Sequence, residues 1–297
     1  MKQSQEWQGM LLGFLGVAAF GLTLPVTRTI VPYMDPLFIG FGRATVAAVV
    51  AAFLLWQQKV PLPDSKQCMQ LVAVSLGVVI GFPVLSSVAM QTVHASHGAV
   101  VLGLLPLATA LVAVFVSHEK PSIGFWLMSI LGSAVVVRFV LGGVETQISI
   151  GDIALLAAVF CAAVGYAVGG TLSRTLGGWQ VICWALVFAS PFTLIPAIWY
   201  MPEIQSVPHA AWMGFLYLAL VSQLFGFFLW NKGLAMGGVA RVSQLQLLQV
   251  FITLFVAYIF LNEPLSTRTW LYGLGVVAIV GIGKSMPVAR LDNAKSQ

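Results

Sequence analysis

Charged side chains are scarce in this chain. Only 8% of its 297 residues are Asp, Glu, Lys or Arg, whereas 59% are hydrophobic. Because a soluble domain carries about 25% charged residues, a surface that faces water cannot be built from this composition. Most of the surface must therefore face lipid. This deficit predicts an integral membrane protein without a separate soluble domain.

Metal ligands and catalytic sets are also scarce. Three scattered cysteines, Cys68, Cys161 and Cys183, indicate packing residues rather than a disulfide frame or a metal cluster. No apolar run contains paired carboxylates or a central His, and there is no GxxxxGKS/T motif. We therefore expect no enzyme, no metal or other cofactor, and no direct use of ATP. The basic residues form no stripe with aromatic residues, so we expect no nucleic acid as a partner.

Long apolar runs are abundant, and they predict ten membrane-spanning helices. Backbone groups left unpaired in hydrocarbon are costly, so each run is expected to be α-helical. The first run exceeds the roughly 7–15 apolar residues of a signal peptide, so we expect it to be retained. The predicted spans are residues 8–31, 36–56, 68–90, 96–117, 122–141, 150–172, 179–200, 210–231, 241–261 and 268–286.

Basic residues are unevenly distributed between the two ends of these spans. With the N-terminus in the cytoplasm, only Arg28, Arg138 and Arg268 fall on the outer side, and Arg43 lies within a span. The inner side holds Lys2, Lys59, Lys66, Lys120, Arg174, Lys232, Arg241, Lys284, Arg290 and Lys295. This positive-inside bias predicts a multi-pass protein of the cell's inner membrane with both termini in the cytoplasm.

The chain repeats itself after about 144 residues. The residues that follow span four recur after span nine, so that Glu119, Ser122 and Trp126 match Glu263, Ser266 and Trp270. The two repeats, 1–145 and 146–297, hold five spans each, and an odd number inverts the second repeat in the bilayer. We therefore predict two inverted five-helix repeats, with a binding site near the midplane between them.

Polar residues within spans mark the candidate site, because they are costly in lipid. Arg43 in span two either clamps a substrate carboxylate or holds the halves together, and we favour the structural role. Gln246, Gln249 and Thr253 share one face of span nine, where we favour a wet cavity over contacts between helices. The candidate substrate-binding residues are Arg43, Thr23, Thr27, Ser86, Met90, Tyr166, Trp184, Gln223, Trp230, Gln246, Gln249 and Thr253.

Carboxylates are missing from the middle of every span. Asp152 is interpreted as a helix-start residue, and Glu119 and Glu263 as residues that close the turns after spans four and nine. His94 and His97 are expected to be solvated in the loop between spans three and four. The sequence therefore predicts no carboxylate proton relay.

Several short features together carry a family resemblance. They are Phe20-Gly21, Pro25, Arg43, Pro106, Glu119, Gly151-Asp152 and Asn262-Glu263-Pro264-Leu265. With these features the chain resembles the EamA-type branch of the drug/metabolite transporter superfamily. It departs from the family at Phe20, where tryptophan is common, and at Val250, where proline is common.

The resemblance implies a ten-helix secondary carrier that exports small metabolites such as amino acids or drug-like amphipathic compounds. The expected partners are a small-molecule substrate and the lipid bilayer, and the expected state is a monomer. Import of a vitamin, sugar or nucleotide-like metabolite is the alternative. An intramembrane enzyme or a channel is more remote, because it would need a catalytic set or a filter loop.

Overall fold

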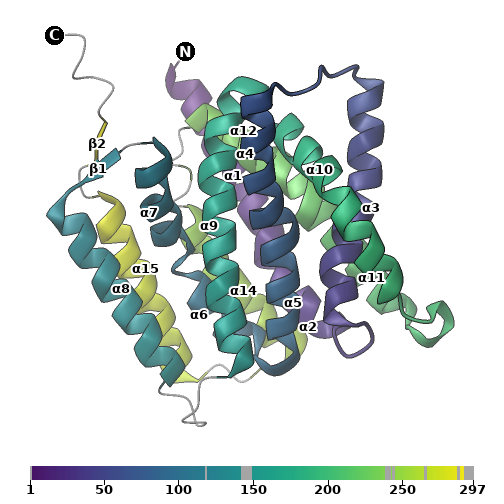
Figure 1. Ribbon diagram of the computed structural model, residues 1–297. Helices are drawn as coiled ribbons and strands as arrows, with labels where there is room; N and C mark the ends of the chain where they lie inside the picture. The colour runs from purple at the N-terminus through teal and green to yellow at the C-terminus, as the bar shows by residue number, and fades with distance from the viewer. Residues whose placement is uncertain are drawn as a thin grey trace.

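Long helices that run roughly side by side make up the computed structural model (Figure 1). The structure describes residues 2–117, 119–141, 149–237, 242, 245–263, 266–285 and 288–290. Within these residues there are ten helical stretches, five in each half of the chain. The all-α fold with ten helices is therefore confirmed, and most predicted ends differ from the observed ones by only a few residues.

The first half contains eight α-helices and one π-helical segment, joined into five stretches. They are α1 (Lys2–Gly21) with α2 (Thr23–Ile30), α3 (Pro36–Gln57), α4 (Ser65–Val74) with η1 (Ser75–Gly81) and α5 (Phe82–Thr92), α6 (Ala95–Leu102) with α7 (Leu105–Ser117), and α8 (Ile123–Leu141).

The second half has the same five-part order. Its stretches are α9 (Ile150–Leu176), α10 (Gly178–Trp199), α11 (His209–Leu216) with η3 (Tyr217–Phe225) and α12 (Gly226–Gly237), α14 (Gln246–Leu261), and α15 (Thr267–Ser285). A 3-10 turn, η2 (Ile204–Ser206), precedes α11. Strands β1 (Glu119–Pro121) and β2 (Val288–Arg290) pair antiparallel and join the two halves.

Most of these stretches have the length and composition of membrane spans. Seven described stretches qualify: Trp7–Ile30, Pro36–Gln57, Ser65–Thr92, Ala95–Val116, Ile150–Leu176, Gly178–Trp199 and His209–Met236. The apolar helix α14 is shorter, whereas α8 and α15 have 19 residues each. A span needs about 17–25 residues, so the helices together form a multi-pass bundle.

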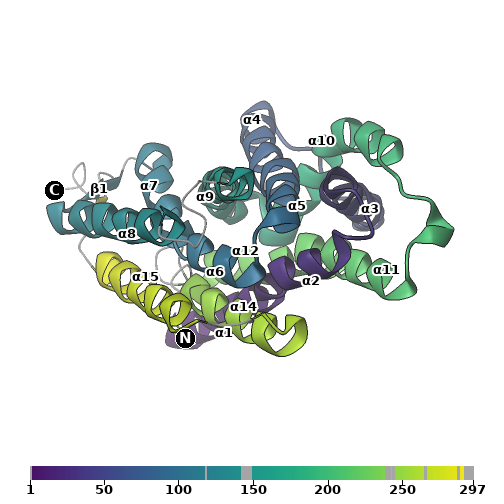
Figure 2. The same ribbon diagram turned by 90° about the horizontal axis from the view of Figure 1, so that it is seen from below.

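Helix contacts repeat when the two halves are exchanged. The first helix of each half packs on the third and fourth helices of the other half: α1 on α12 and α14, and α9 on α5 and α7. The second helices, α3 and α10, pack on each other, as do the fifth helices, α8 and α15 (Figure 2). This exchange is the arrangement expected for a duplicated repeat whose halves interlock.

A π-helical segment interrupts the third helix of each half. The segments Ser75–Gly81 and Tyr217–Phe225 occupy corresponding positions in the two repeats. The first approaches α9 closely, since a Cβ added to Gly77 would lie 2.8 Å from the backbone nitrogen of Gly165. π-Helical turns inside α-helices occur frequently at functional sites, which directs attention to the residues beside them.

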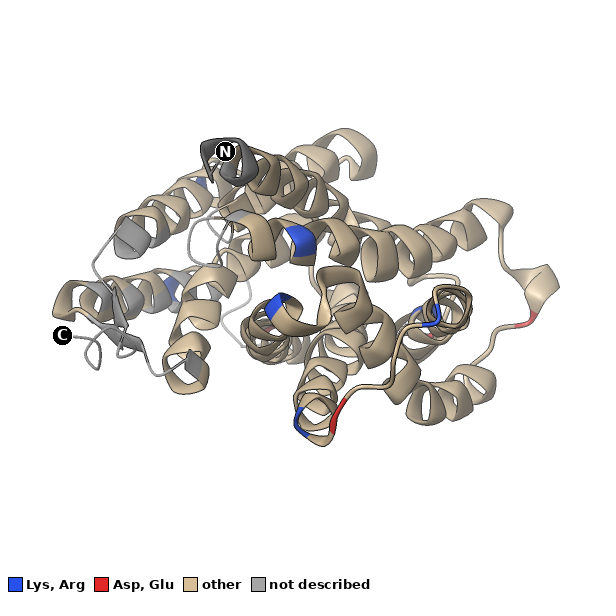
Figure 3. Cartoon of the chain, turned by 90° about the horizontal axis from the view of Figure 1, so that it is seen from above, with Lys and Arg blue, Asp and Glu red and all other residues tan. Residues whose placement is uncertain are grey.

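Charge is confined largely to the ends of the bundle. Figure 3 views the end at which the N-terminus lies, where Lys and Arg occupy several helix ends and Asp and Glu few positions. The interior is lined by apolar side chains with isolated polar residues among them. Those buried polar residues are where a binding site must be sought.

Candidate functional site

Arg43 and Gln223 connect the two halves inside the bundle. Arg43 is only 1% exposed, and its Nε and Nη2 donate to Oε1 of Gln223 at 3.0 and 2.7 Å. Gln223 in η3 in turn donates from Nε2 to the carbonyl oxygen of Val78 in η1, at 2.9 Å. One guanidinium and one amide therefore tie α3 to both π-helical segments.

The remaining terminal nitrogen of Arg43 is buried but unused. Nη1 has no hydrogen-bond partner among the described residues. An unsatisfied buried donor costs about 1–3 kcal/mol, and more when it is charged. Because guanidinium groups bind carboxylates and phosphates well, Nη1 is suited to hold an anionic group of a ligand.

Aromatic rings from three helices pack together, and one of them, Tyr166, lies within electrostatic range of Arg43. The ring centroid of Tyr166 in α9 lies 6.4 Å from that of Phe20 in α1 and 5.8 Å from that of Trp230 in α12. Phe227 packs 4.9 Å from Phe20. Trp230 is fully buried, and its Nε1 has no partner in the described part of the chain. The cluster offers an apolar surface with one free donor.

Hydroxyl groups make further contacts between the halves. Thr23 and Ser222 share a hydrogen bond of 2.8 Å between their Oγ atoms, and Thr253 donates to the carbonyl oxygen of Gly21 at 2.7 Å. Thr27 donates to the Thr23 carbonyl within its own helix. These hydroxyls are satisfied, so they shape the wall of the site rather than offer free groups.

The glutamines of α14 are buried and largely unsatisfied. Gln246 is 3% and Gln249 6% exposed. Both amide atoms of Gln246, and Oε1 of Gln249, lack partners among the described residues. Since buried amides are normally hydrogen-bonded, this face of α14 resembles a binding surface more than a helix–helix contact.

Ser86, Met90 and Trp184 were predicted to bind substrate, but no hydrogen bond or ring contact among the described residues joins them to the central cluster. Ser86 donates to the Pro83 carbonyl one turn back. The Met90 side chain is buried, and its backbone carbonyl accepts from Arg28. Trp184 lines a cavity with Leu55, at the end of α3 about 18 Å along the helix from Arg43. The structure therefore does not bring Trp184 to Arg43.

Two cavities lie away from the central cluster. One, of about 680 Å³, lies at the end of α3, and the other, of about 470 Å³, lies beside α12. Both are at the end of the bundle where the N-terminus lies (Figure 1). Arg43, Gln223, Gln246 and Gln249 line neither of them. The central cluster therefore lies apart from both of these cavities.

Glu263 has a role that the sequence analysis missed. Its two carboxylate oxygens accept hydrogen bonds from the backbone nitrogens of Ala95 and Ser96, both at 2.9 Å. These are the first residues of α6, so the carboxylate caps a helix of the other half, where the helix dipole favours negative charge. Glu263 thus does more than close the turn after its own helix.

The expectation for His97 was wrong. It lies in α6, not in a solvated loop, and its Nε2 is 2.8 Å from Oδ1 of Asp152. The ring also packs against Phe139, with 4.7 Å between centroids. Asp152 completes a capping box with Ser149 at the start of α9, which confirms its interpretation as a helix-start residue. The side chain of Glu119 lies outside the described part of the structure, so its role in closing the turn after span four stays a prediction.

Ser222 and Phe227 are site residues that the sequence analysis did not single out. Phe227 precedes Trp230 by one helical turn, and Ser222 is adjacent to Gln223. The spacing of Phe227 and Trp230 and the adjacency of Ser222 and Gln223 are both visible in the sequence. A search for the neighbours of each candidate on the same helix face would have found Phe227.

Comparison with known proteins agrees with this architecture. Two segments, residues 7–141 and 149–283, each match the model of the EamA-like transporter family. One solved crystal structure superposes on 92% of this chain and 98% of its own chain, with a TM-score of 0.66 and 15% identity. At that identity the likeness shows a shared fold alone.

Curated relatives match along nearly the whole chain. The uncharacterized transporter YdeK of Bacillus subtilis (strain 168) is 40% identical over 93% of this chain and 96% of its own length. The uncharacterized transporter YyaM of the same organism is 24% identical over 97% and 96%, respectively. Protein PecM of Dickeya dadantii (strain 3937) is 24% identical over 85% and 84%.

Proposed function

Because this chain belongs to the EamA-like transporter family and is thus a membrane transporter rather than an enzyme, we propose that it exports a small amphipathic metabolite by alternating access. One observation carries the proposal. Among the described residues, Nη1 of Arg43, Nε1 of Trp230, both amide atoms of Gln246 and Oε1 of Gln249 are buried without partners, on helices that pack across the two halves. A substrate enclosed there would satisfy them.

The chemistry of these groups suggests the class of substrate. Nη1 of Arg43 would bind a carboxylate or another anionic group. Phe20, Tyr166 and Trp230 would contact an apolar or aromatic body, and the two glutamines would bond an amine, hydroxyl or amide. Amino acids and similar amphipathic metabolites combine these features.

The moving units of the proposal are the two repeats, 1–145 and 146–297. Each half contributes α-helices to both sides of the cluster, so rocking one half against the other would open it to either face. We place both termini in the cytoplasm from the distribution of basic residues, and we expect a monomer, because one chain holds both halves of the site.

Import of a vitamin, sugar or nucleotide-like metabolite is the competing proposal. A sugar offers no anionic group for Nη1 of Arg43 and little apolar surface for the rings, so this cluster suits it less well. Transport in liposomes loaded on one side distinguishes the two, because an exporter and an importer respond to opposite gradients when orientation is controlled.

The test of the site uses Gln223→Glu in purified protein. The new carboxylate would pair with Arg43 and compete with an anionic substrate, while keeping the size of the side chain. We expect binding of a carboxylate-bearing substrate to weaken at least tenfold, whereas an uncharged analogue is affected much less. Arg174→Gln removes an exposed charge at the end of α9 and serves as the control. Unchanged carboxylate binding by Gln223→Glu would overturn the proposal.

A further inference from the structure

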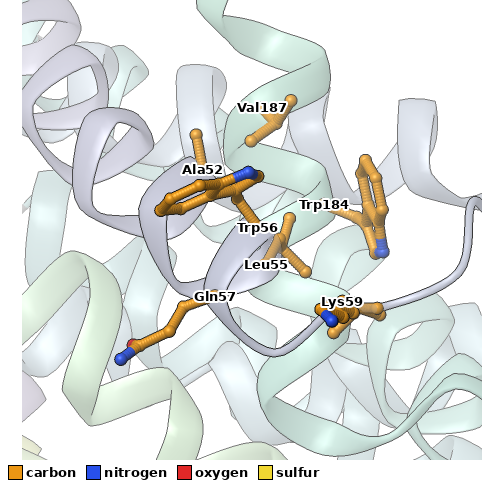
Figure 4. A pocket seen from close by; sticks show the side chains of 8 residues that line it. Ala52, Leu55, Trp56, Gln57, Lys59, Trp184 and Val187 are labelled. Carbon is orange, nitrogen blue, oxygen red and sulfur yellow. The ribbon is translucent and has the colours of Figure 1, made fainter.

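The larger of the two cavities described above is a groove far from the central cluster, between the end of α3 and the start of α10. Its volume is about 680 Å³, and its lining includes Ala52, Leu55, Trp56, Lys59, Trp184 and Val187. Figure 4 shows the rings of Trp56 and Trp184 on opposite sides of this groove, with Leu55 between them. A volume in this range is sufficient for a small molecule or part of a lipid.

The groove opens toward the outside of the bundle. Trp56 is 76% exposed, and Phe53 on the same helix is 55% exposed. On a membrane helix such exposed rings face lipid, and tryptophans at helix ends occupy the headgroup region. The open side of the groove therefore faces the bilayer near its interface rather than the interior of the transporter.

Positive charge and a free donor stand at the polar end of the groove. Lys59 follows the last turn of α3 in a left-handed conformation, with φ of 50°, and its side chain is exposed. No carboxylate in the described part of the chain forms an ion pair with it. Nε1 of Trp184, a residue that is nine-tenths buried, also lacks a partner there.

We propose that this groove is a binding site for an anionic phospholipid of the surrounding leaflet. The acyl chain lies against Ala52, Leu55 and Val187, and the phosphate is held by Lys59 near the indole of Trp184. Lysines close to an anionic membrane surface attract its headgroups, and the apolar walls suit hydrocarbon. The inference needs only that the chain spans a membrane, so it stands apart from the proposed transport substrate.

The test compares lipids on the purified protein in detergent. Phosphatidylglycerol and phosphatidylcholine of the same chain length are added in turn, and bound lipid is counted by native mass spectrometry while Tm is followed. We expect phosphatidylglycerol to bind more tightly and to raise Tm more. Lys59→Gln should lower its occupancy by about fivefold, and Val187→Phe should lower occupancy of both lipids by filling the groove.

Lys66→Gln is the matched control, since Lys66 is an exposed lysine at the start of the next helix and does not line the groove. It should leave the preference unchanged. Equal loss in the Lys59 and Lys66 variants would reduce the effect to general surface charge and overturn the site. Glycerol 3-phosphate raising Tm as much as the lipid would also overturn it, because the groove would then bind a soluble anion.

Discussion

At the scale of residues, the buried polar side chains on one face of α14 differ in whether they are hydrogen-bonded. Thr253 is fully satisfied by the carbonyl of Gly21, whereas Gln249 leaves its Oε1 without a described partner. Both side chains are buried, with 1% of Thr253 and 6% of Gln249 exposed. Thr253 thus belongs to the contact between α14 and α1, and Gln249 is the residue that we propose contacts a ligand.

Substitution separates these two roles. Gln249→Leu removes an unsatisfied amide, so we expect Tm to stay the same or rise, while substrate affinity falls several-fold or more. Thr253→Val removes a satisfied hydrogen bond and should destabilise the protein by about 1 kcal/mol with little effect on affinity. Thermal unfolding and ligand binding of both variants provide the check. A lower Tm with unchanged affinity in Gln249→Leu would make the glutamine a helix–helix contact.

At the scale of helices, the carboxylate of Glu263 connects α14 of the second half to α6 of the first. Glu263, just after α14, binds the first two backbone nitrogens of α6, and His97, the third residue of α6, contacts Asp152 of α9. Three helices are thereby fixed together at the end of the bundle opposite the N-terminus (Figure 1). Under the proposed alternating access, this end would loosen when the site opens on that side.

Removing the charge of this cap should weaken the packing at this end of the bundle. For Glu263→Gln we expect a loss of about 1 kcal/mol of stability and faster hydrogen exchange at the start of α6. Glu203→Gln changes an exposed glutamate beside a short 3-10 turn and should affect neither quantity. Equal exchange rates for α6 in both variants would show that the cap does not hold the helices together at this end.

Close packing of η1 on α9 yields a second prediction for the elements. Gly77→Ala would place a Cβ against the backbone of α9, so we expect a loss of roughly 1–3 kcal/mol, the usual cost of overpacking. The matched variant is Gly275→Ala in α15, where an added Cβ meets nothing within 4 Å. That variant should be neutral or stabilised by helix propensity. Similar Tm values for the two would contradict the close approach.

At the scale of the whole molecule, hydrophobic runs were sufficient to predict ten helices. The recurrence of Glu119 and Ser122 as Glu263 and Ser266 was sufficient to predict the repeat. Those signals are local or depend on spacing alone. The contacts of Glu263 with α6, and of Arg43 with Gln223, depend on which helices pack together. Hydropathy contains no such information, which is why Arg43 was placed correctly in a span but its partner was not identified.

Orientation of the whole chain remains a prediction from its basic residues. Reporter fusions at Gln297 and at residue 147, before α9, should report opposite sides of the membrane, with Gln297 on the cytoplasmic side. Five helices separate these two points, so an odd number of crossings is expected. The same side for both fusions would contradict two inverted five-helix repeats.

Access of water to the central cluster tests alternating access most directly, because it needs no knowledge of the substrate. Gln249→Cys is prepared in a chain whose three native cysteines are replaced, and a membrane-impermeant thiol reagent is applied to each side in turn. Leu254→Cys, on the same helix but fully buried among apolar residues, is the dry control. Alternating access predicts that Cys at position 249 reacts from both sides and Cys at position 254 from neither. If Cys at position 249 reacted from neither side, a substrate site between the halves would be contradicted.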